Sequence, residues 1–319
     1  MSLDVWPPIP PADLRLKEAE TQARELGWIT AETLRVCKEL KHGLEDCYAL
    51  LAPVDPGSTL VMSTARSEKV KGTITRVGTR IVKGTLNLQL RTMPPHNLQL
   101  SPQHSIHIPA LDKLHNHLNE SLDLLSVILS AKQPPDAKSL AQTLTLLSES
   151  IAASAALLKG PPLTTPDQSW TTSSCPPGIF SPPLAPNISF HIGLQDSCIV
   201  LLIRALEPCQ AAVHTLTKLG LAIGTVRRLE HDEMDSVFKY NVSGYAEAGS
   251  RGHGGQRSSE ATRQPQYAPN AEDVYVREKV RVESGDPSLI SLYSKLGFLS
   301  HVLGQTRRNL AAVIGYDMD

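Results

Sequence analysis

The segment VYVREKVRVESGDPSLISLYSKLGFLSHVL, residues 274–303, decides the fold of this chain. In its first part, four valines share one parity and alternate with polar or aromatic residues, which is the pattern of a strand with one buried face. These valines are Val274, Val276, Val280 and Val282. The segment therefore begins with a predicted strand that needs a sheet beside it.

The dipeptide Asp286-Pro287 marks a change from strand to helix. An aspartate carboxylate accepts the free N–H groups of a first helical turn, and proline suits the first helical position because no N–H is needed there. Leucines then follow at alternating spacings of three and four residues, a narrow apolar stripe that requires partner helices. They are Leu289, Leu292, Leu296, Leu299 and Leu303. One segment thus predicts two kinds of core, a sheet and a bundle.

Composition and charge exclude several classes of protein. A net charge of −1 and a pI of about 6.8 lack the basic excess of a nucleic-acid-binding protein. No apolar run is long enough for a membrane-spanning helix, and no secretory signal is expected at the N-terminus. The five cysteines show no C-x-x-C spacing, which indicates reduced thiols and a cytoplasmic protein.

Three more helices are expected. The first covers about residues 13–51, although Gly27 and Gly43 weaken it and can interrupt it. Two leucine-striped helices with a short link follow and predict an antiparallel hairpin, closed by Lys159-Gly160-Pro161. The first stripe is Leu26, Ile29, Thr33, Cys37, Leu40, Leu44, Cys47 and Leu51; the hairpin stripes are Leu111, Leu114, Leu118, Leu122, Leu125 and Leu129, then Leu140, Leu144, Leu147, Ile151 and Leu158.

Strands are predicted between these helices from period-2 alternation and an abundance of Val, Ile and Thr. A turn at Gln195-Asp196 leads into the apolar run CIVLLI, residues 198–203. Residues 160–186 hold eight of the 24 prolines and are interpreted as a linker. Residues 246–270 contain no large aliphatic side chain and are interpreted as a disordered loop.

Because strands occur in consecutive clusters, the sequence favours a segregated α+β fold. Both terminal tracts and the central hairpin are expected to form an antiparallel helical bundle, and the strands an antiparallel β-sheet domain joined to it. The expected bundle covers 12–52, 110–159 and 286–315, and the expected sheet domain covers 58–108, 187–245 and 271–285.

No pattern typical of a catalytic or cofactor site is convincing. GTITRVGTR, residues 72–80, resembles a phosphate-binding loop, but its glycines are wrongly spaced and Thr79 replaces the lysine. A β-turn or a bulge is the better interpretation. The acidic cluster HDEMD, residues 231–235, lacks the glycine and distal glutamate of a calcium loop.

The histidine pairs do not form a metal site either. His115 and His117 lie two apart on a predicted helix and therefore point in different directions. His104 and His107 have no nearby cluster of Cys, Asp or Glu. We therefore predict no catalytic, cofactor-binding or metal-binding residue, and no enzyme activity.

Five segments, taken in order, carry a family resemblance. They are VKGTLNLQLRTMPPHNLQL (82–100), KLHNHLNESLDLLSVIL (113–129), SFHIGLQDSCIVLLIRALEP (189–208), LGLAIGTVRRLEHDEMDSVFKYN (219–241) and VREKVRVESGDPSLISLYSKL (276–296). Together they resemble the Rogdi family, also called the second subunit of the RAVE complex. The resemblance implies a helical bundle containing both terminal helices, joined to a β-sheet domain, with the family's leucine zipper at 111–129.

The resemblance also implies a function. It implies an adaptor that promotes assembly and reassembly of the vacuolar proton-transporting ATPase (V-ATPase), and so vacuolar and endosomal acidification. The implied partners are a large β-propeller scaffold subunit, peripheral-sector subunits of the ATPase and, in some lineages, a Skp-type adaptor. The chain would then be cytoplasmic and recruited peripherally to membranes, without inserting into them.

Two alternatives remain. The leucine stripes permit a self-associating zipper scaffold unrelated to the ATPase, in which Leu111, Leu118 and Leu125 face a second copy. Each stripe spans three heptads or fewer, and the other stripes of the chain can cover it, which favours an internal bundle and a monomer. An enzyme with an unrecognised site would need a polar pocket with converging titratable groups.

Overall fold

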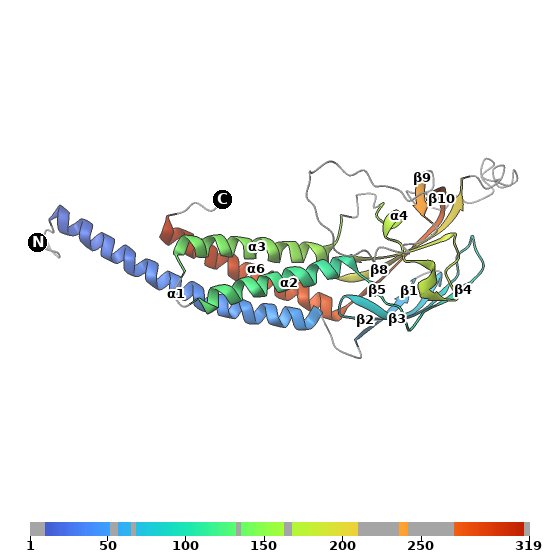
Figure 1. The fold of residues 1–319 in the computed structure, drawn as a ribbon, viewed down its shortest axis with the longest axis horizontal. Helices are drawn as coiled ribbons and strands as arrows, with labels where there is room; N and C mark the ends of the chain where they lie inside the picture. Colours follow the sequence, from blue (N-terminus) through green and yellow to red (C-terminus); the bar gives the residue numbers. More distant parts are fainter. Residues whose placement is uncertain are drawn as a thin grey trace, which may run out of the picture. The chain divides into compact units, whose positions relative to one another are not determined.

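The computed structural model describes residues 10–51, 57–64, 68–131, 135–162, 168–209, 236–241 and 271–315. Over these residues the chain forms α-helices and antiparallel sheets, which confirms the α+β class (Figure 1). The predicted loop 246–270 and the acidic cluster 231–235 lie outside the described residues.

The chain divides into two compact units, each built from separate stretches of sequence. The helical unit contains Met1–Leu51, Lys113–Leu157 and Ser291–Asp319, and the sheet unit contains Ala52–Asp112 and Leu158–Ile290.

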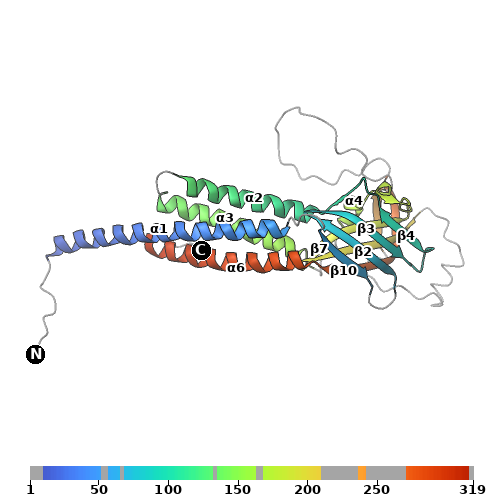
Figure 2. The same cartoon turned by 90° about the horizontal axis from the view of Figure 1, so that it is seen from below.

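Among its described residues, the helical unit contains four long helices, which lie side by side (Figures 1 and 2). They are α1 (Pro11–Leu51), α2 (Pro109–Ser130), α3 (Ala137–Lys159) and α6 (Pro287–Ile314). Among the described residues, polar contacts join successive helices in a ring. In the pairs α1–α2, α3–α6 and α6–α1 the contact joins the later half of one helix to the earlier half of the other, and a short link joins α2 to α3, so neighbouring helices run antiparallel. The contacts join Tyr48 to His115, Ser121 to Ser150, Thr145 to Arg307 and Lys295 to Asp46.

The leucine stripes form the core of this bundle, as predicted. In α6 all five predicted leucines are buried, and in α3 all five predicted positions are buried. In α2, Leu122 and Leu129 are only half-buried, whereas the other four leucines are buried. In α1 the prediction is wrong for Leu26, whose side chain is 37% exposed, and correct for the remaining seven positions.

The expected interruption of the first helix does not occur, because α1 is continuous through both glycines. A Cβ atom at Gly43 would lie 2.6 Å from Cδ2 of Leu299 in α6. The absence of a side chain at residue 43 therefore leaves room for the Leu299 side chain, which accounts for a glycine inside a helix.

Helix α3 is long and apolar enough, by length and composition alone, to cross a membrane. Its apolar stripe nevertheless packs within the bundle, where Leu140, Leu144, Ile151 and Leu158 are almost fully buried. A core helix of a bundle can have the same length and apolar composition, so this feature alone is weak evidence for a membrane span.

The described part of the sheet unit forms two antiparallel sheets. The first has the strand order β1-β2-β3-β4-β6, with β5 also paired to β3, and the second has the order β7-β8-β10-β9. The strands are β1 (Ser58–Ser63), β2 (Val70–Val77), β3 (Arg80–Leu88), β4 (His96–Leu100), β5 (Ile106–His107), β6 (Phe180–Ser181), β7 (Ile188–Gln195), β8 (Cys198–Pro208), β9 (Val237–Asn241) and β10 (Ala271–Gly285).

The turn between β7 and β8 also closes the end of α3. Asp196 and Ser197 both have positive φ angles, 47° and 61°, and form the two-residue turn that the sequence predicts near this position. Their N–H groups donate to the carbonyl oxygens of Lys159 and Leu158, at 2.9 and 2.8 Å. Gly160 has a φ of 78°, which confirms the left-handed helix end.

The interpretation of residues 160–186 as a linker is wrong for its second half. Residues 168–186 contain α4 (Trp170–Ser173), a 3₁₀ turn (Pro177–Ile179) and β6, which pairs with β4. Trp170 is fully buried, with the Arg204 guanidinium 4.5 Å from the centre of its ring. The segment lies against strand β7, where the Cys175 N–H donates to the Phe190 carbonyl at 2.7 Å.

Candidate functional site

The glycine-containing segment 72–80 is a β-hairpin. It runs along β2, turns at Gly78, whose φ is 60°, and enters β3, with a register shift at Thr75/Arg76. A Cβ atom at Gly72 would lie 1.9 Å from the Thr85 carbonyl oxygen, so this glycine serves strand packing. The turn and bulge interpretation is confirmed.

The histidines are engaged in separate local contacts. His115 lies 3.1 Å from Tyr48 Oη through Nε2 and 3.2 Å from Asn119 Nδ2 through Nδ1. His117 pairs instead with Glu120 at 3.7 Å. Across the described residues, no group of three or more His, Cys, Asp and Glu side chains could hold a metal ion.

Three cysteines lie buried in apolar surroundings. Burial raises the pKa of Cys37 to about 11, and that of both Cys47 and Cys175 to about 12. At neutral pH these side chains are therefore thiols rather than thiolates, which makes them unsuitable as nucleophiles.

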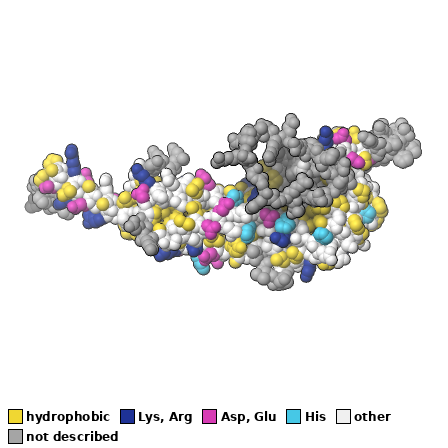
Figure 3. Space-filling view, viewed as in Figure 1, with side chains coloured by type: hydrophobic (Ala, Val, Ile, Leu, Met, Phe, Trp, Pro, Cys, Tyr) yellow, Lys and Arg dark blue, Asp and Glu magenta, His cyan; other side chains and the backbone are white. Residues whose placement is uncertain are grey.

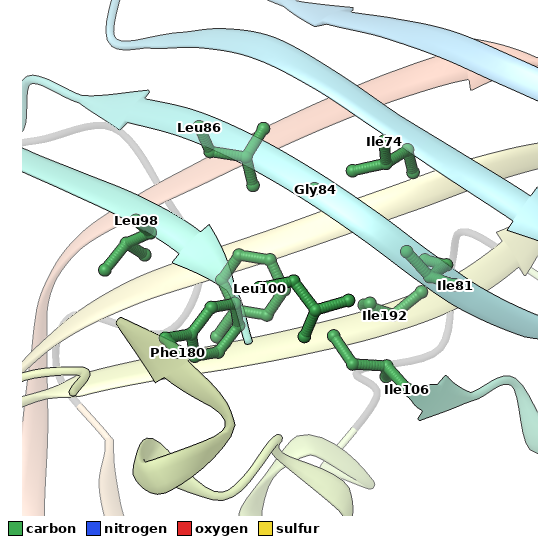
Figure 4. A pocket seen from close by; sticks show the side chains of 10 residues that line it. Ile74, Ile81, Gly84, Leu86, Leu98, Leu100, Ile106, Phe180 and Ile192 are labelled. Atoms are coloured by element: carbon green, nitrogen blue, oxygen red, sulfur yellow. The ribbon is translucent and has the colours of Figure 1, made fainter. Parts of the chain in front are cut away.

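A small cavity lies between the two sheets (Figure 4). Its volume is about 10 Å³, and every side chain that lines it is apolar. Ligand sites typically enclose about 300 Å³ or more, so this cavity is a gap in the sheet core. The lining comes from both sheets: Ile74, Ile81, Gly84, Leu86, Leu98, Leu100, Ile106 and Phe180 from the first sheet, and Phe190 and Ile192 from the second.

The most buried charges belong to Arg76 and Asp286, which form an ion pair within the sheet unit. Both side chains are fully buried, and Arg76 Nε donates to Asp286 Oδ2 at 2.6 Å. Arg76 Nη1 also donates to the Gly78 carbonyl at 2.6 Å. The other carboxylate oxygen accepts the N–H groups of Ser288 and Leu289, at 2.9 and 3.4 Å, so Asp286 caps α6 as predicted.

A second buried carboxylate, Glu278 on β10, joins the two sheets. One oxygen accepts from Lys69 Nζ at 2.8 Å, and the other accepts the N–H groups of Arg91 and Thr92 at 2.7 and 3.2 Å. Burial acts to raise the pKa of Glu278, but Lys69 and these two backbone N–H groups outweigh it, so the pKa lies below its ordinary value. Glu278 is therefore ionised, and it fixes the turn after β3 to the second sheet.

Replacing Glu278 by glutamine should destabilise the sheet unit by about 2–3 kcal/mol, because Lys69 loses its anion and one acceptor oxygen becomes a donor. A carboxylate with a lowered pKa stabilises the fold at pH values above its unfolded pKa, and this contribution disappears as the pH falls through the folded pKa. We expect wild-type stability to fall with acidification below about pH 4.5, and less steeply in E278Q. Denaturant unfolding at several pH values measures both effects.

The matched control is Glu283→Gln on the same strand, since the Glu283 side chain is 57% exposed and pairs with Arg281 near the surface. Its free energy of unfolding should stay within about 0.5 kcal/mol of the wild type. Equal effects of the two substitutions would contradict the role given to Glu278.

The comparison with protein families gives a clear match. The profile of the family described as "Rogdi leucine zipper containing protein" matches residues 25–311 of the 319 residues. The chain belongs to the Rogdi leucine zipper family. No curated protein sequence matched the chain.

Membership of the Rogdi family directs attention to the leucine zipper. In this Rogdi chain, the stripe at 111–129 includes Leu118 and Leu125, buried in the helical unit, and Leu111, buried in the sheet unit, each no more than 1% exposed. These leucines are not available to a second copy while the bundle is intact. Any protein that bound the intact bundle would therefore have to use other surfaces.

Proposed function

We propose that this chain is a non-catalytic adaptor subunit of a RAVE-type complex that promotes assembly and reassembly of the V-ATPase. The family match over residues 25–311 carries the proposal. The five segments that resemble the family all lie inside that range, between residues 82 and 296. Acidification of vacuoles and endosomes would follow from the assembled pump.

The proposed partners are a large β-propeller scaffold subunit, peripheral-sector subunits of the ATPase and, in some lineages, a Skp-type adaptor. The chain would act in the cytoplasm as a monomer and reach vacuolar or endosomal membranes through these partners. The ATP chemistry would belong to the pump. This division of labour is supported by the local, structural roles of the histidines and buried thiols described above.

The zipper alternative receives less support from the described residues. A zipper built on α2 would need Leu111, Leu118 and Leu125 to face another chain, yet all three are buried within the chain itself. Exposing them would require the bundle to open, at a cost of about 1.5–3 kcal/mol for each leucine.

Affinity capture tests the proposal. A tagged chain, introduced into cells and recovered from extract, should bring down the β-propeller scaffold and peripheral-sector subunits, identified by mass spectrometry. The Leu118→Asp variant, whose bundle should not fold, is the negative control. Recovery of neither partner by a wild-type chain with native helical circular dichroism would refute the proposal.

A further inference from the structure

The first part of α1 makes no packing contact that buries a side chain. Every residue from Pro11 to Trp28 is exposed, whereas buried positions begin at Ile29. Figures 1 and 2 show this part of α1 extending past the ends of the other helices of the helical unit, and Figure 3 shows apolar and charged side chains over it. We call residues 11–28 the α1 extension.

The α1 extension nevertheless continues the apolar stripe of the packed half. Five apolar residues of the extension recur at alternating spacings of four and three. The same spacing continues to Thr30 and Thr33, which are buried and lie where the buried stripe begins. The stripe therefore stays on the face that packs against the bundle further along. Its exposed members are Ala12, Leu16, Ala19, Ala23 and Leu26, with Leu16 at 62% and Leu26 at 37% exposure.

The composition of this exposed stripe suits a second helix. Three of its five residues are alanines, which leave room for large apolar side chains from a partner. The chain already uses this arrangement at Gly43, where the small residue of α1 receives Leu299 of α6. At about 1.5 Å per residue, the α1 extension offers roughly 27 Å of helix, enough for about five turns of a partner.

A second copy of this chain does not fit the stripe. Asp13 and Glu20 flank it on one side, and Arg15 and Gln22 flank it on the other. An antiparallel copy would place the acidic flank opposite the same flank of its partner, because equivalent flanks meet in antiparallel coiled coils. A parallel copy would bring both bundles into the same space, because the stripe faces the side on which α2, α3 and α6 pack.

We propose that the stripe of the α1 extension binds one amphipathic helix of a different protein. That helix carries large apolar residues that fill the spaces at Ala12, Ala19 and Ala23, and Lys or Arg residues along the edge that faces Asp13 and Glu20. The family match begins at residue 25, so the surface lies almost entirely outside it and the inference does not depend on the proposed function. An interface of this length is small and is expected to bind weakly by itself.

Two labelled synthetic helical peptides of 18 residues test the inference by fluorescence anisotropy with the full-length chain. Both have leucine at the stripe positions and glutamate along the edge facing Arg15. One has lysine and the other glutamate along the edge facing Asp13 and Glu20. The lysine peptide should bind at least tenfold more tightly, and its advantage should shrink in high salt.

The double variant Leu16→Asp, Leu26→Asp should bind the lysine peptide at least tenfold more weakly, with unchanged circular dichroism because both residues are exposed. Val127→Asp is the control, since Val127 is 70% exposed on α2 and lies outside the stripe. Equal binding of the two peptides, or full binding by the double variant, would overturn the inference. So would a concentration-dependent dimer of the wild type that the double variant abolishes, because the occupant would then be a second copy.

Discussion

Replacing Leu118 by aspartate should unfold the helical bundle rather than separate two chains. Leu118 is 1% exposed on α2, so the substitution removes a buried side chain and places a carboxylate in an apolar core. The lost packing and the unpaired charge together cost at least about 4 kcal/mol. Denaturant unfolding, followed by circular dichroism at 222 nm, measures the loss of helical structure.

The control for this substitution is Val127→Asp on the same helix, whose exposed side chain predicts a change within about 0.5 kcal/mol. Light scattering separates the two interpretations of the leucine stripe. An internal bundle predicts a wild-type monomer and an unfolded L118D variant. A wild-type dimer that L118D converts into a folded monomer would establish the zipper instead.

The second large effect is expected at Asp286. Replacing it by alanine removes the carboxylate that faces the fully buried Arg76 guanidinium, and also the acceptor that caps α6. Removing one partner of a buried ion pair costs about 3–5 kcal/mol, because the remaining charge stays in a dry environment. The loss appears as a lower denaturant midpoint with an unchanged slope.

Two further variants make the Asp286 prediction specific. Asp112→Ala removes a first-turn aspartate whose side chain is 41% exposed, at the start of α2, and should cost no more than about 1 kcal/mol. Adding Arg76→Met to Asp286→Ala should recover part of the lost free energy of unfolding. Removing both side chains takes both charges out of the core, whereas removing only Asp286 leaves the Arg76 guanidinium there without that carboxylate. A D286A chain as stable as D112A would contradict the assignment.

The helices could be predicted from sequence because their signals are local. A stripe such as Leu289 to Leu303 repeats at helical spacing, and the cap at Asp286 requires only the residues that follow it. The exposure of the α1 extension could not be predicted, again because sequence signals are local. The alanines of the extension continue the stripe with weak hydrophobicity, and a local pattern does not reveal whether a partner helix reaches them.

The buried polar residues could not be predicted, because their partners are distant in sequence. Glu278 alternates in step with the buried valines of β10 and is therefore expected on their face. Arg91, whose N–H group donates to the Glu278 carboxylate, lies 187 positions away in the sequence. Arg76 lies 210 positions from Asp286. Strand alternation identifies a buried face, but the pairing that places these charges together depends on the register of both sheets.

The proline-rich segment shows how composition can mislead. Eight prolines between residues 160 and 186 suggested a linker, but proline removes only one backbone donor and leaves side chains free to pack. Trp170 and Phe180 are both buried, and Trp170 lies in a cluster with Phe238 and Tyr240. Two buried aromatic residues, in a chain with 4% aromatics, were the signal of an ordered segment.

Cells depleted of this Rogdi-family chain test its proposed, non-catalytic role in V-ATPase assembly. After the two sectors of the ATPase have separated and been allowed to rejoin, the membrane-bound share of the peripheral sector is measured by fractionation. A lower share is expected in depleted cells, restored by the wild-type chain and not by L118D. An unchanged share in cells that lack the chain would contradict it.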